Sequence, residues 1–272
     1  MSPDRSGPHR FFFVHVMKTG GTSLAFHLTR PFSERERWPA EPDRASPLDV
    51  EPYTSLTALR DIDPARRAEV RLFAGHLPLC ARELMGPDVV TLTVLREPVA
   101  RTVSVLKHFR RLWPRFANAS LDEIYEEPFI FRHFVENFQA RVLALTGADG
   151  TRSFCSRASY RSLRDALAAA EPLPEPAVDA TVTIDAGRTA AACAALEGID
   201  ALGLTDDLVG FVAELQRRFG WWPDGIDATG RVNVSAEDWD VSPSLIRRIA
   251  VDNAADVEVY RHAATLVERR RR

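Results

Sequence analysis

The stretch Phe11-Phe-Phe-Val-His-Val-Met-Lys-Thr-Gly-Gly-Thr-Ser23 decides how this chain should fold. Its first six residues form a compact apolar run that favours a β-strand buried on both faces, as in a parallel sheet. Lys18–Ser23 predicts a tight glycine-rich loop, and Ser23–Leu28 predicts the first turns of a helix. A strand, a glycine-rich loop and a helix start form a common phosphate-binding arrangement, because backbone N–H groups and the helix N-terminus face the anion.

Strand-like and helix-like segments alternate along the rest of the chain. We expect further strands at Val70–His76, Val89–Leu95, Ala180–Asp185 and Asp200–Leu204. We expect helices at Val99–Arg111, Leu121–Leu145 (broken at Pro128), Ser162–Ala170, Thr205–Phe219 and Ser242–Arg271. Strands separated by helices predict an α/β fold: a P-loop-like central parallel sheet flanked by helices on both faces, in a single domain.

Composition indicates where this domain begins and ends. We expect a flexible N-terminus at residues 1–10 and the folded domain at residues 11–267. Residues 268–272 should form a basic tail, whose arginines suit a helix C-terminus. Ser33–Pro64 is rich in Pro, Glu, Arg and Asp and predicts a long surface excursion. Glu171–Pro176 predicts a linker.

The bulk composition excludes several classes of protein. The chain has 272 residues, of which 45% are hydrophobic and 27% charged, and its net charge is -3. These values are typical of a globular protein and give no general case for a nucleic acid or an anionic membrane as partner. The three cysteines are widely spaced, so we expect neither disulfides nor a metal site. The apolar run at Phe11–Val16 is too short for a signal peptide or a membrane span, which predicts a cytoplasmic protein.

Lysine usage draws attention to one position in the loop. The chain has only two lysines, Lys18 and Lys107, among 35 basic residues. In a Walker A loop the lysine follows the glycines, whereas Lys18 precedes them and lies at the strand end. There it would approach the 5′ end of a nucleotide, near the bond that breaks. A glycine-rich turn with a surface lysine is the simpler interpretation of this loop alone.

The segment His15–Ser23 resembles the 5′-phosphosulfate loop of carbohydrate-type sulfotransferases of family 2 (heparan sulfate 2-O-like), whose usual form is H-[IV]-P-K-T-G-G-T-S. Met17 replaces the customary proline. The resemblance implies 3′-phosphoadenosine-5′-phosphosulfate (PAPS) as co-substrate, with 3′,5′-ADP as product. It implies that the loop binds the phosphosulfate through Lys18, Thr19, Gly20, Gly21, Thr22 and Ser23, with Lys18 also catalytic.

A second segment, Leu95-Arg-Glu-Pro-Val-Ala-Arg-Thr-Val-Ser104, is similar to the family's L-R-[DE]-P-x-x-R-x-x-S motif. Arg96 at a strand end offers a bidentate fork for a phosphate, and Ser104 adds a hydroxyl. The resemblance makes both ligands of the 3′-phosphate. The simpler alternative is that Arg96 caps a strand and Ser104 lies on a solvated face. Arg101 is expected to serve structure, pairing with Glu97.

His76 is the candidate catalytic base. Transfer to a hydroxyl requires a group that removes its proton, and histidine is suited to this because its pKa lies near neutrality. His76 ends a predicted strand, where the family's G-H-x-x segment carries its proposed base. A strand-end histidine satisfied by the backbone is the alternative. His15 is the second candidate, with an orienting role, while His27, His108 and His262 are expected on helix faces.

Four later segments match family motifs in order. Asn137–Leu143 is similar to N-x-Q-x-R-x-L and could lie near the nucleotide or acceptor, or simply form a helix face. The others are Leu202–Leu208, Arg231–Ser235 and Asn253–Tyr260, so that the resemblance runs from Phe11 to Ala264. The segments that match weakly are Ser33–Pro64, Arg110–Phe134 and Thr146–Ala192. We expect the acceptor side at about 33–64 and 110–192.

These observations predict a bacterial, cytoplasmic sulfotransferase that acts on a hydroxyl of a sugar, glycolipid or secondary metabolite, with no nucleic acid partner and no stable membrane anchor. A P-loop small-molecule kinase would keep the fold, but should carry its lysine after the glycines and an aspartate for Mg²⁺. A non-catalytic PAPS- or 3′,5′-ADP-binding module is the third interpretation, and it predicts damage at Lys18 or His76, both of which are present.

Overall fold

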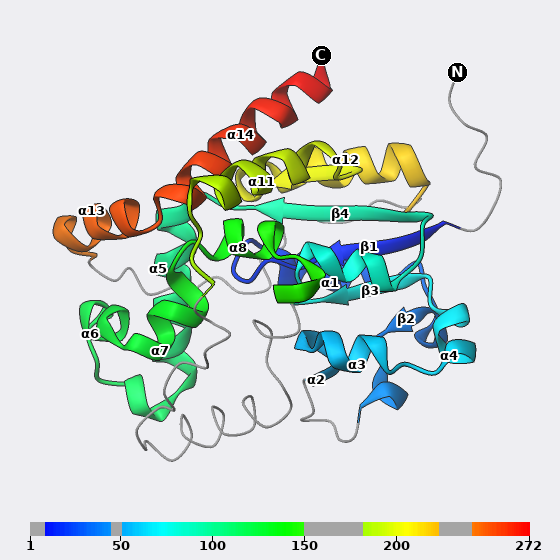
Figure 1. Ribbon diagram of the computed structural model, residues 1–272, viewed down its shortest axis with the longest axis horizontal. Helices are drawn as coiled ribbons and strands as arrows, with labels where there is room; N and C mark the ends of the chain where they lie inside the picture. Colours follow the sequence, from blue (N-terminus) through cyan, green and yellow to red (C-terminus); the bar gives the residue numbers. More distant parts are fainter. Residues whose placement is uncertain (1–8, 45–50, 150–181, 223–240) are drawn as a thin grey trace.

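A parallel sheet forms the centre of the protein. The computed structural model describes residues 9–44, 51–149, 182–222 and 241–272. Its strands are β1 (Arg10–Val14), β2 (Arg37–Trp38), β3 (Leu72–Gly75), β4 (Val89–Leu95) and β5 (Ala201–Leu204). They pair in the order β2-β3-β1-β4-β5, every pair parallel (Figure 1). The predicted α/β fold with a parallel sheet is confirmed.

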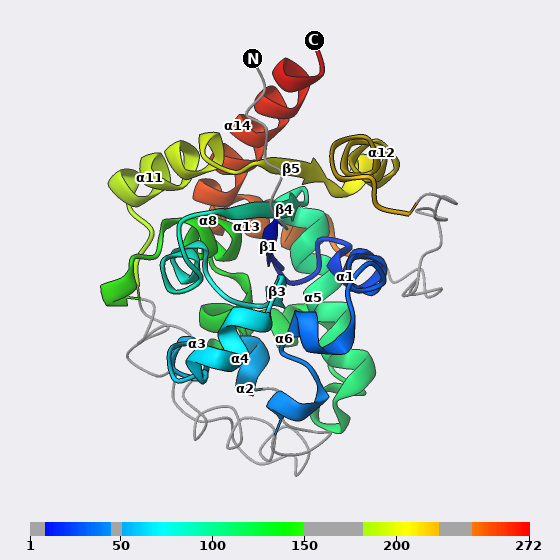
Figure 2. The same ribbon diagram turned by 90° about the vertical axis from the view of Figure 1, so that its right-hand side faces the viewer.

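Helices cover both faces of this sheet, as Figure 2 shows. Phe11 and Phe13 of β1 pack with α1 (Gly21–Thr29) and α12 (Leu208–Phe219) on one face. Phe12 and Val14 pack on the other face, against four helices: α3 (Leu56–Arg60), α8 (Phe138–Ala144), α11 (Ala186–Glu197) and α14 (Ala254–Arg271). Burial from both sides explains why β1 is almost entirely apolar and why every residue of β4, including Thr91 and Thr93, is buried.

A second helical cluster lies beyond the carboxyl ends of the strands, toward which β1 and β4 point in Figure 1. It consists of α5 (Pro98–Leu112), α6 (Leu121–Glu126), α7 (Pro128–Ile130) and α13 (Pro243–Asp252), which share an apolar core. The remaining short elements are α2 (Glu51–Thr54), α4 (Pro64–Glu69), a π turn at Phe131–Val135, and 3-10 turns at Glu34–Glu36, Glu41–Asp43, Leu79–Leu84, Pro114–Phe116 and Thr205–Asp207. None of the helices in the described ranges is long and apolar enough to cross a membrane.

The predicted surface excursion at Ser33–Pro64 was wrong in character. Its described residues include β2, which pairs with β3 at the edge of the sheet, and they bury Trp38, Leu56 and Leu59 to 3% exposure or less. A strand of two residues carries no periodicity that a sequence pattern could reveal.

Two further predictions need correction. Residues 182–185 form no strand, because Asp185 caps α11 by accepting a hydrogen bond from the Arg188 N–H at 2.8 Å. The predicted tail helix is two helices, α13 and α14, which meet at Asn253. The predictions for Ser162–Ala170, Glu171–Pro176 and Arg231–Ser235 lie outside the described residues.

Candidate active site

The loop after β1 has an unusual backbone. Lys18 and Gly20 both have positive φ, 69° and 80°. A Cβ on Gly20 would lie 2.9 Å from Cδ1 of Leu208, so both backbone conformation and close packing require glycine there. A lysine in the left-handed region costs of order 1–3 kcal/mol and persists only where the surroundings enforce it. The loop is therefore held by its contacts.

Three side chains hold successive carbonyl groups of this loop. Arg101 Nε donates to the Met17 oxygen at 3.1 Å, Arg96 Nη1 to the Lys18 oxygen at 3.3 Å, and Thr205 Oγ1 to the Thr19 oxygen at 2.8 Å. A trans peptide points its N–H opposite to its C=O, so the N–H groups that follow turn away from these three anchors. N–H groups aligned in this way bind anions.

The other loop residues fall into two groups. Thr19 is fully buried, and its hydroxyl donates to the Val16 oxygen at 2.9 Å, so it can contribute to a ligand only through its backbone. Gly21, Thr22 and Ser23 form the first turn of α1, whose N-cap, Gly20, offers no capping side chain. The N-terminus of α1 thus adds its uncapped N–H groups to the loop.

Cations gather around Lys18. Its pKa is lowered to about 8, first by burial and then by the positive charges of Arg111, Arg96 and Arg101. Among the described residues, no carboxylate contributes to this shift. Arg96 comes from the end of β4, and Arg101 and Arg111 come from α5. A partly buried lysine surrounded by guanidinium groups would be stabilised by an anionic ligand.

Gln139 positions Arg96. The backbone N–H of Arg96 donates to Gln139 Oε1 at 3.0 Å, and Gln139 Nε2 donates to the Arg96 oxygen at 2.8 Å. Gln139 is fully buried, and Asp256 in turn accepts hydrogen bonds from the N–H groups of Gln139 and Ala140 at 3.2 and 2.7 Å. This explains the motif around residue 139: the glutamine fixes the backbone from which the Arg96 side chain extends.

The other two residues of that motif are also structural. Asn137 Oδ1 accepts from the Ala255 N–H at 3.1 Å, which joins α8 to α14. Arg141 is buried and donates to the backbone oxygens of Arg132 and His133 at 2.6 and 3.1 Å. Both side chains therefore hold α8 in place.

Arg101 serves the loop rather than pairing with Glu97. The Glu97 carboxylate caps α5, accepting from the N–H groups of Val99 and Ala100 at 3.0 and 2.7 Å, so the predicted ion pair was wrong. Arg101 is fully buried, its guanidinium lies 4.3 Å from the Phe138 ring centroid, and burial lowers its pKa to about 9. Its Nη1 has no hydrogen-bond partner in the described structure.

Ser104 and His108 extend the same face of α5. Ser104 follows Arg101 by three residues and precedes His108 by four, which places all three on one side of the helix. The pKa of His108 is lowered to about 4, first by burial and then by the charges of Lys18, Arg111 and His76, so this side faces the loop. The Nδ1 atom of His108 is buried without a partner in the described structure. Sequence reasoning missed His108 as a site residue, although its spacing from Ser104 could have revealed it.

His76 has the protonation state of a base. Its Nδ1 lies 2.8 Å from the backbone oxygen of His15, which can only accept, so Nδ1 carries the proton and Nε2 keeps its lone pair. Burial lowers the pKa of His76, the hydrogen bond to His15 opposes this, and the Lys18 charge lowers it further. The ring is therefore neutral at pH 7. The His15 and His76 rings lie 4.3 Å apart, so His15 supports His76 through both its ring and its backbone.

A cavity of about 300 Å³ opens beside these two histidines, between α1 and the β2 edge of the sheet. Its lining residues are His15, Ala25, Phe26, Thr29, Glu34, Arg37, Trp38, Pro39, Ala40, Glu41, Tyr53, Leu72, Ala74, Gly75 and His76. Gly75 is required at its floor, because a Cβ there would lie 2.6 Å from the Tyr53 backbone oxygen. Within the described residues, no three side chains of His, Cys, Asp or Glu are arranged to hold a metal ion.

The chain is similar to known carbohydrate sulfotransferases, although no family model matches it. It is 30% identical to galactose-3-O-sulfotransferase 3 of Mus musculus over 170 residues, which is 58% of this chain and 39% of that protein. It is also 30% identical over 169 residues to the Homo sapiens protein of the same name, with the same coverage. The alignments thus span about two fifths of the length of these relatives. Both relatives are named for the sulfation of galactose, whereas the motifs of the chain resemble those of heparan sulfate 2-O-type enzymes. Both findings relate the chain to sulfotransferases.

Proposed function

We propose that this protein transfers the sulfuryl group of PAPS to a hydroxyl of a sugar-like acceptor. The observation that carries the proposal is the environment of Lys18: a loop lysine among three arginines whose combined charge and burial lower its pKa to about 8. The similarity to galactose sulfotransferases supports the same reaction and supplies the acceptor class.

The residues at the strand ends fit a nucleotide with phosphate at both ends. The N–H groups after Met17 and the start of α1 would hold the 5′-phosphosulfate, and Arg96 and Ser104 the 3′-phosphate. Strands β1 and β4 are neighbours in the sheet, so the loop and Arg96 lie at the same edge, where α/β proteins bind nucleotides. The orphaned Nη1 of Arg101, beside the loop, adds to this fit.

The transfer needs two actions from the protein. His76 Nε2 accepts the proton of the acceptor hydroxyl as its oxygen attacks sulfur, and Lys18 neutralises the charge that develops on the phosphate oxygen as the sulfur–oxygen bond breaks. The new oxygen–sulfur bond completes the sulfate ester, 3′,5′-ADP leaves, and His76 later releases the proton to solvent. The hydroxyl would reach His76 from the adjoining cavity, which His76 lines.

Nucleotide recognition tests this proposal directly. In thermal-shift and calorimetric titrations, 3′,5′-ADP should bind and raise the Tm, whereas 5′-AMP, which lacks the 3′-phosphate, should bind at least tenfold more weakly. Arg96→Ala should remove that preference. Radiolabelled PAPS with a panel of galactosides then tests transfer itself.

Two results would contradict the proposal. Failure of both PAPS and 3′,5′-ADP to bind would overturn it. Binding of ATP with Mg²⁺ and phosphorylation of an acceptor would instead establish the kinase alternative.

A further inference from the structure

The carboxylates of the cavity wall, residues 33–44, divide into two sets. Asp43 pairs with Arg66 at 2.8 Å and Glu36 with Arg71 at 3.0 Å, and neither of these acids lines the cavity. The remaining two, Glu34 and Glu41, do line it. Within the described residues, neither of those two pairs with a cation.

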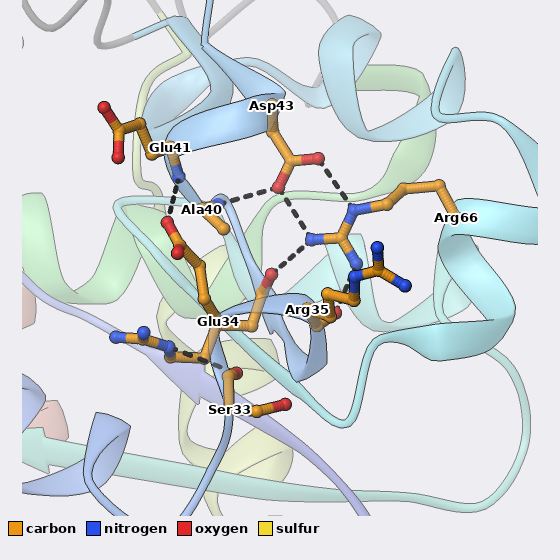
Figure 3. Close-up of polar contacts among 8 residues, drawn as sticks. Ser33, Glu34, Arg35, Ala40, Glu41, Asp43 and Arg66 are labelled. Carbon is orange, nitrogen blue, oxygen red and sulfur yellow. Dashed lines mark hydrogen bonds and ion pairs between the residues drawn. The ribbon is translucent and has the colours of Figure 1, made fainter.

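Arg66 holds this wall in place through its contacts with Asp43 and the backbone (Figure 3). Its guanidinium donates to both carboxylate oxygens of Asp43 at 2.8 Å, and to the backbone oxygens of Arg35 and Arg37 at 2.5 Å. The Asp43 carboxylate also accepts from the Ala40 N–H at 2.7 Å. One half-buried guanidinium therefore ties the backbone at residues 35 and 37 to Asp43.

Arg66 and Asp43 together fix the backbone of the segment that carries Glu34 and Glu41. The backbone N–H of Glu41 donates to Glu34 Oε1 at 3.3 Å, so the Glu34 carboxylate is held against the backbone of residue 41 (Figure 3). Both carboxylates line the same cavity, so their negative charges act on the same ligand. Arg37 is the one cation that lines the cavity among the described residues, so two carboxylates face one guanidinium.

The histidines at the base of the cavity do not change this balance. Burial is the main cause that lowers the pKa of both His15 and His76, so both rings are neutral at pH 7. The aromatic side chains of Phe26, Trp38 and Tyr53 add surfaces on which a sugar ring can pack. The cavity volume, about 300 Å³, lies at the small end of the range for ligand pockets and suits a monosaccharide unit.

From this arrangement we infer that the cavity binds an uncharged or amine-bearing sugar and discriminates against acidic ones, with Glu34 and Glu41 as its specificity-determining residues. The inference rests on the proposed sulfuryl transfer, because it assigns the acceptor of that reaction. It distinguishes this chain from an enzyme for acidic polysaccharides, whose acceptor would bring further negative charge to a wall that already carries two carboxylates.

Three acceptors that share the galactose ring and differ in charge test the inference: methyl β-galactopyranoside, galactosamine and galacturonic acid. With saturating PAPS at low salt, we expect kcat/KM to be highest for galactosamine and about tenfold lower for galacturonic acid than for the neutral glycoside. The double variant Glu34→Gln/Glu41→Gln leaves Arg37 as the charged side chain of the cavity among the described residues, so it should abolish or reverse the preference for galactosamine over galacturonic acid. Raising the salt should compress the ranking in the wild type, because exposed charges are screened.

The control is Glu83→Gln/Glu258→Gln, which removes two exposed carboxylates outside the cavity and should keep the wild-type ranking. Binding of 3′,5′-ADP by every variant separates this inference from the proposed function. If the nucleotide fails to bind the wild type, the proposed function is wrong. If it binds and the charge ranking is flat or reversed, the acceptor class is wrong. Absence of both transfer and binding for all three sugars, with nucleotide binding intact, would overturn the cavity as the acceptor site.

Discussion

The loop before α1 and the cavity wall after it carry opposite charges. At the N-terminal end of α1, Lys18 lies among guanidinium groups, and no carboxylate of the described residues contributes to the lowering of its pKa. Beyond its C-terminal end, Glu34 and Glu41 lie without an ion-pair partner among the described residues. His76 lies within reach of both regions, since the Lys18 charge lowers its pKa and its ring lines the cavity. This difference fits the proposed reaction, in which two substrates of different charge would meet at His76.

The two regions are nevertheless held by the same physical device. Arginine side chains bind backbone carbonyl groups in both, Arg96 and Arg101 at the loop and Arg66 at the wall. A side chain that holds a carbonyl fixes the backbone while leaving N–H groups or neighbouring side chains to face a ligand. At the wall, Arg66 is separate from the two carboxylates that would contact a ligand, whereas at the loop Arg96 would both hold the backbone and contact the nucleotide.

The largest effect should come from the residue between the two regions. His76→Ala should lower kcat about 1,000-fold, because it removes the ring nitrogen that would accept the hydroxyl proton. Affinity for 3′,5′-ADP should stay within about twofold of the wild type. His262→Ala, on the distant helix α14, is the control and should leave both unchanged. Full activity of the His76 variant would show that another base acts, with His15, which lines the same cavity, as the next candidate.

Lys18→Ala should separate chemistry from binding in the loop. We expect kcat to fall about 100-fold, as when one charge-stabilising group is removed, while 3′,5′-ADP affinity falls only a few-fold because the backbone N–H groups remain. Lys107→Ala replaces the other lysine of the chain and should behave as wild type. Arg96→Ala should show the opposite pattern, with a large loss of affinity and a smaller loss of kcat. The reverse assignment of these two phenotypes would exchange the roles of Lys18 and Arg96.

The contrast between the regions also explains what the sequence could predict. The loop is a contiguous run between a strand and a helix, so its residues and Arg96 at the next strand end were recognisable from local pattern. The wall is assembled from residues far apart in sequence. Arg66 and Asp43 are separated by 23 positions, and β2 is only two residues long. No local periodicity encodes such contacts, which is why Ser33–Pro64 was predicted as a surface excursion.

Two further residues, Gln139 and His108, show why sequence patterns alone did not reveal every residue of the candidate site. Gln139 binds Arg96 across 43 positions, so its motif was visible but its function depended on tertiary packing. His108 was detectable in principle, because it lies four residues after Ser104 on the same helix. It was assigned to a helix face because the pattern alone does not say which face of α5 meets the loop.

Gln139→Leu should weaken nucleotide binding at the loop, although Gln139 itself would not contact the nucleotide. The substitution removes both hydrogen bonds to the Arg96 backbone and leaves those groups buried and unsatisfied, at a cost of about 2 kcal/mol in the free energy of unfolding. We expect about tenfold weaker binding of 3′,5′-ADP and a smaller preference over 5′-AMP, because Arg96 is no longer held. The control is Gln216→Leu, on α12, which removes one hydrogen bond to the Trp222 backbone oxygen and should not change this preference. An unaltered preference in the Gln139 variant would show that Arg96 needs no such support.

The smallest expected effect is a dependence of nucleotide affinity on pH, which should come from Lys18 in the loop. The pKa of Lys18 in the free protein is about 8, and an anion bound beside it would raise this value. Because the protonated form binds better, 3′,5′-ADP affinity should fall about fourfold between pH 7.0 and 8.5. Calorimetry at pH 8 in buffers of different ionisation enthalpy should detect proton uptake on binding. Lys18→Ala should abolish both the uptake and the slope, whereas Glu34→Gln/Glu41→Gln should retain them; a slope that persists without Lys18 would assign the titration to another group.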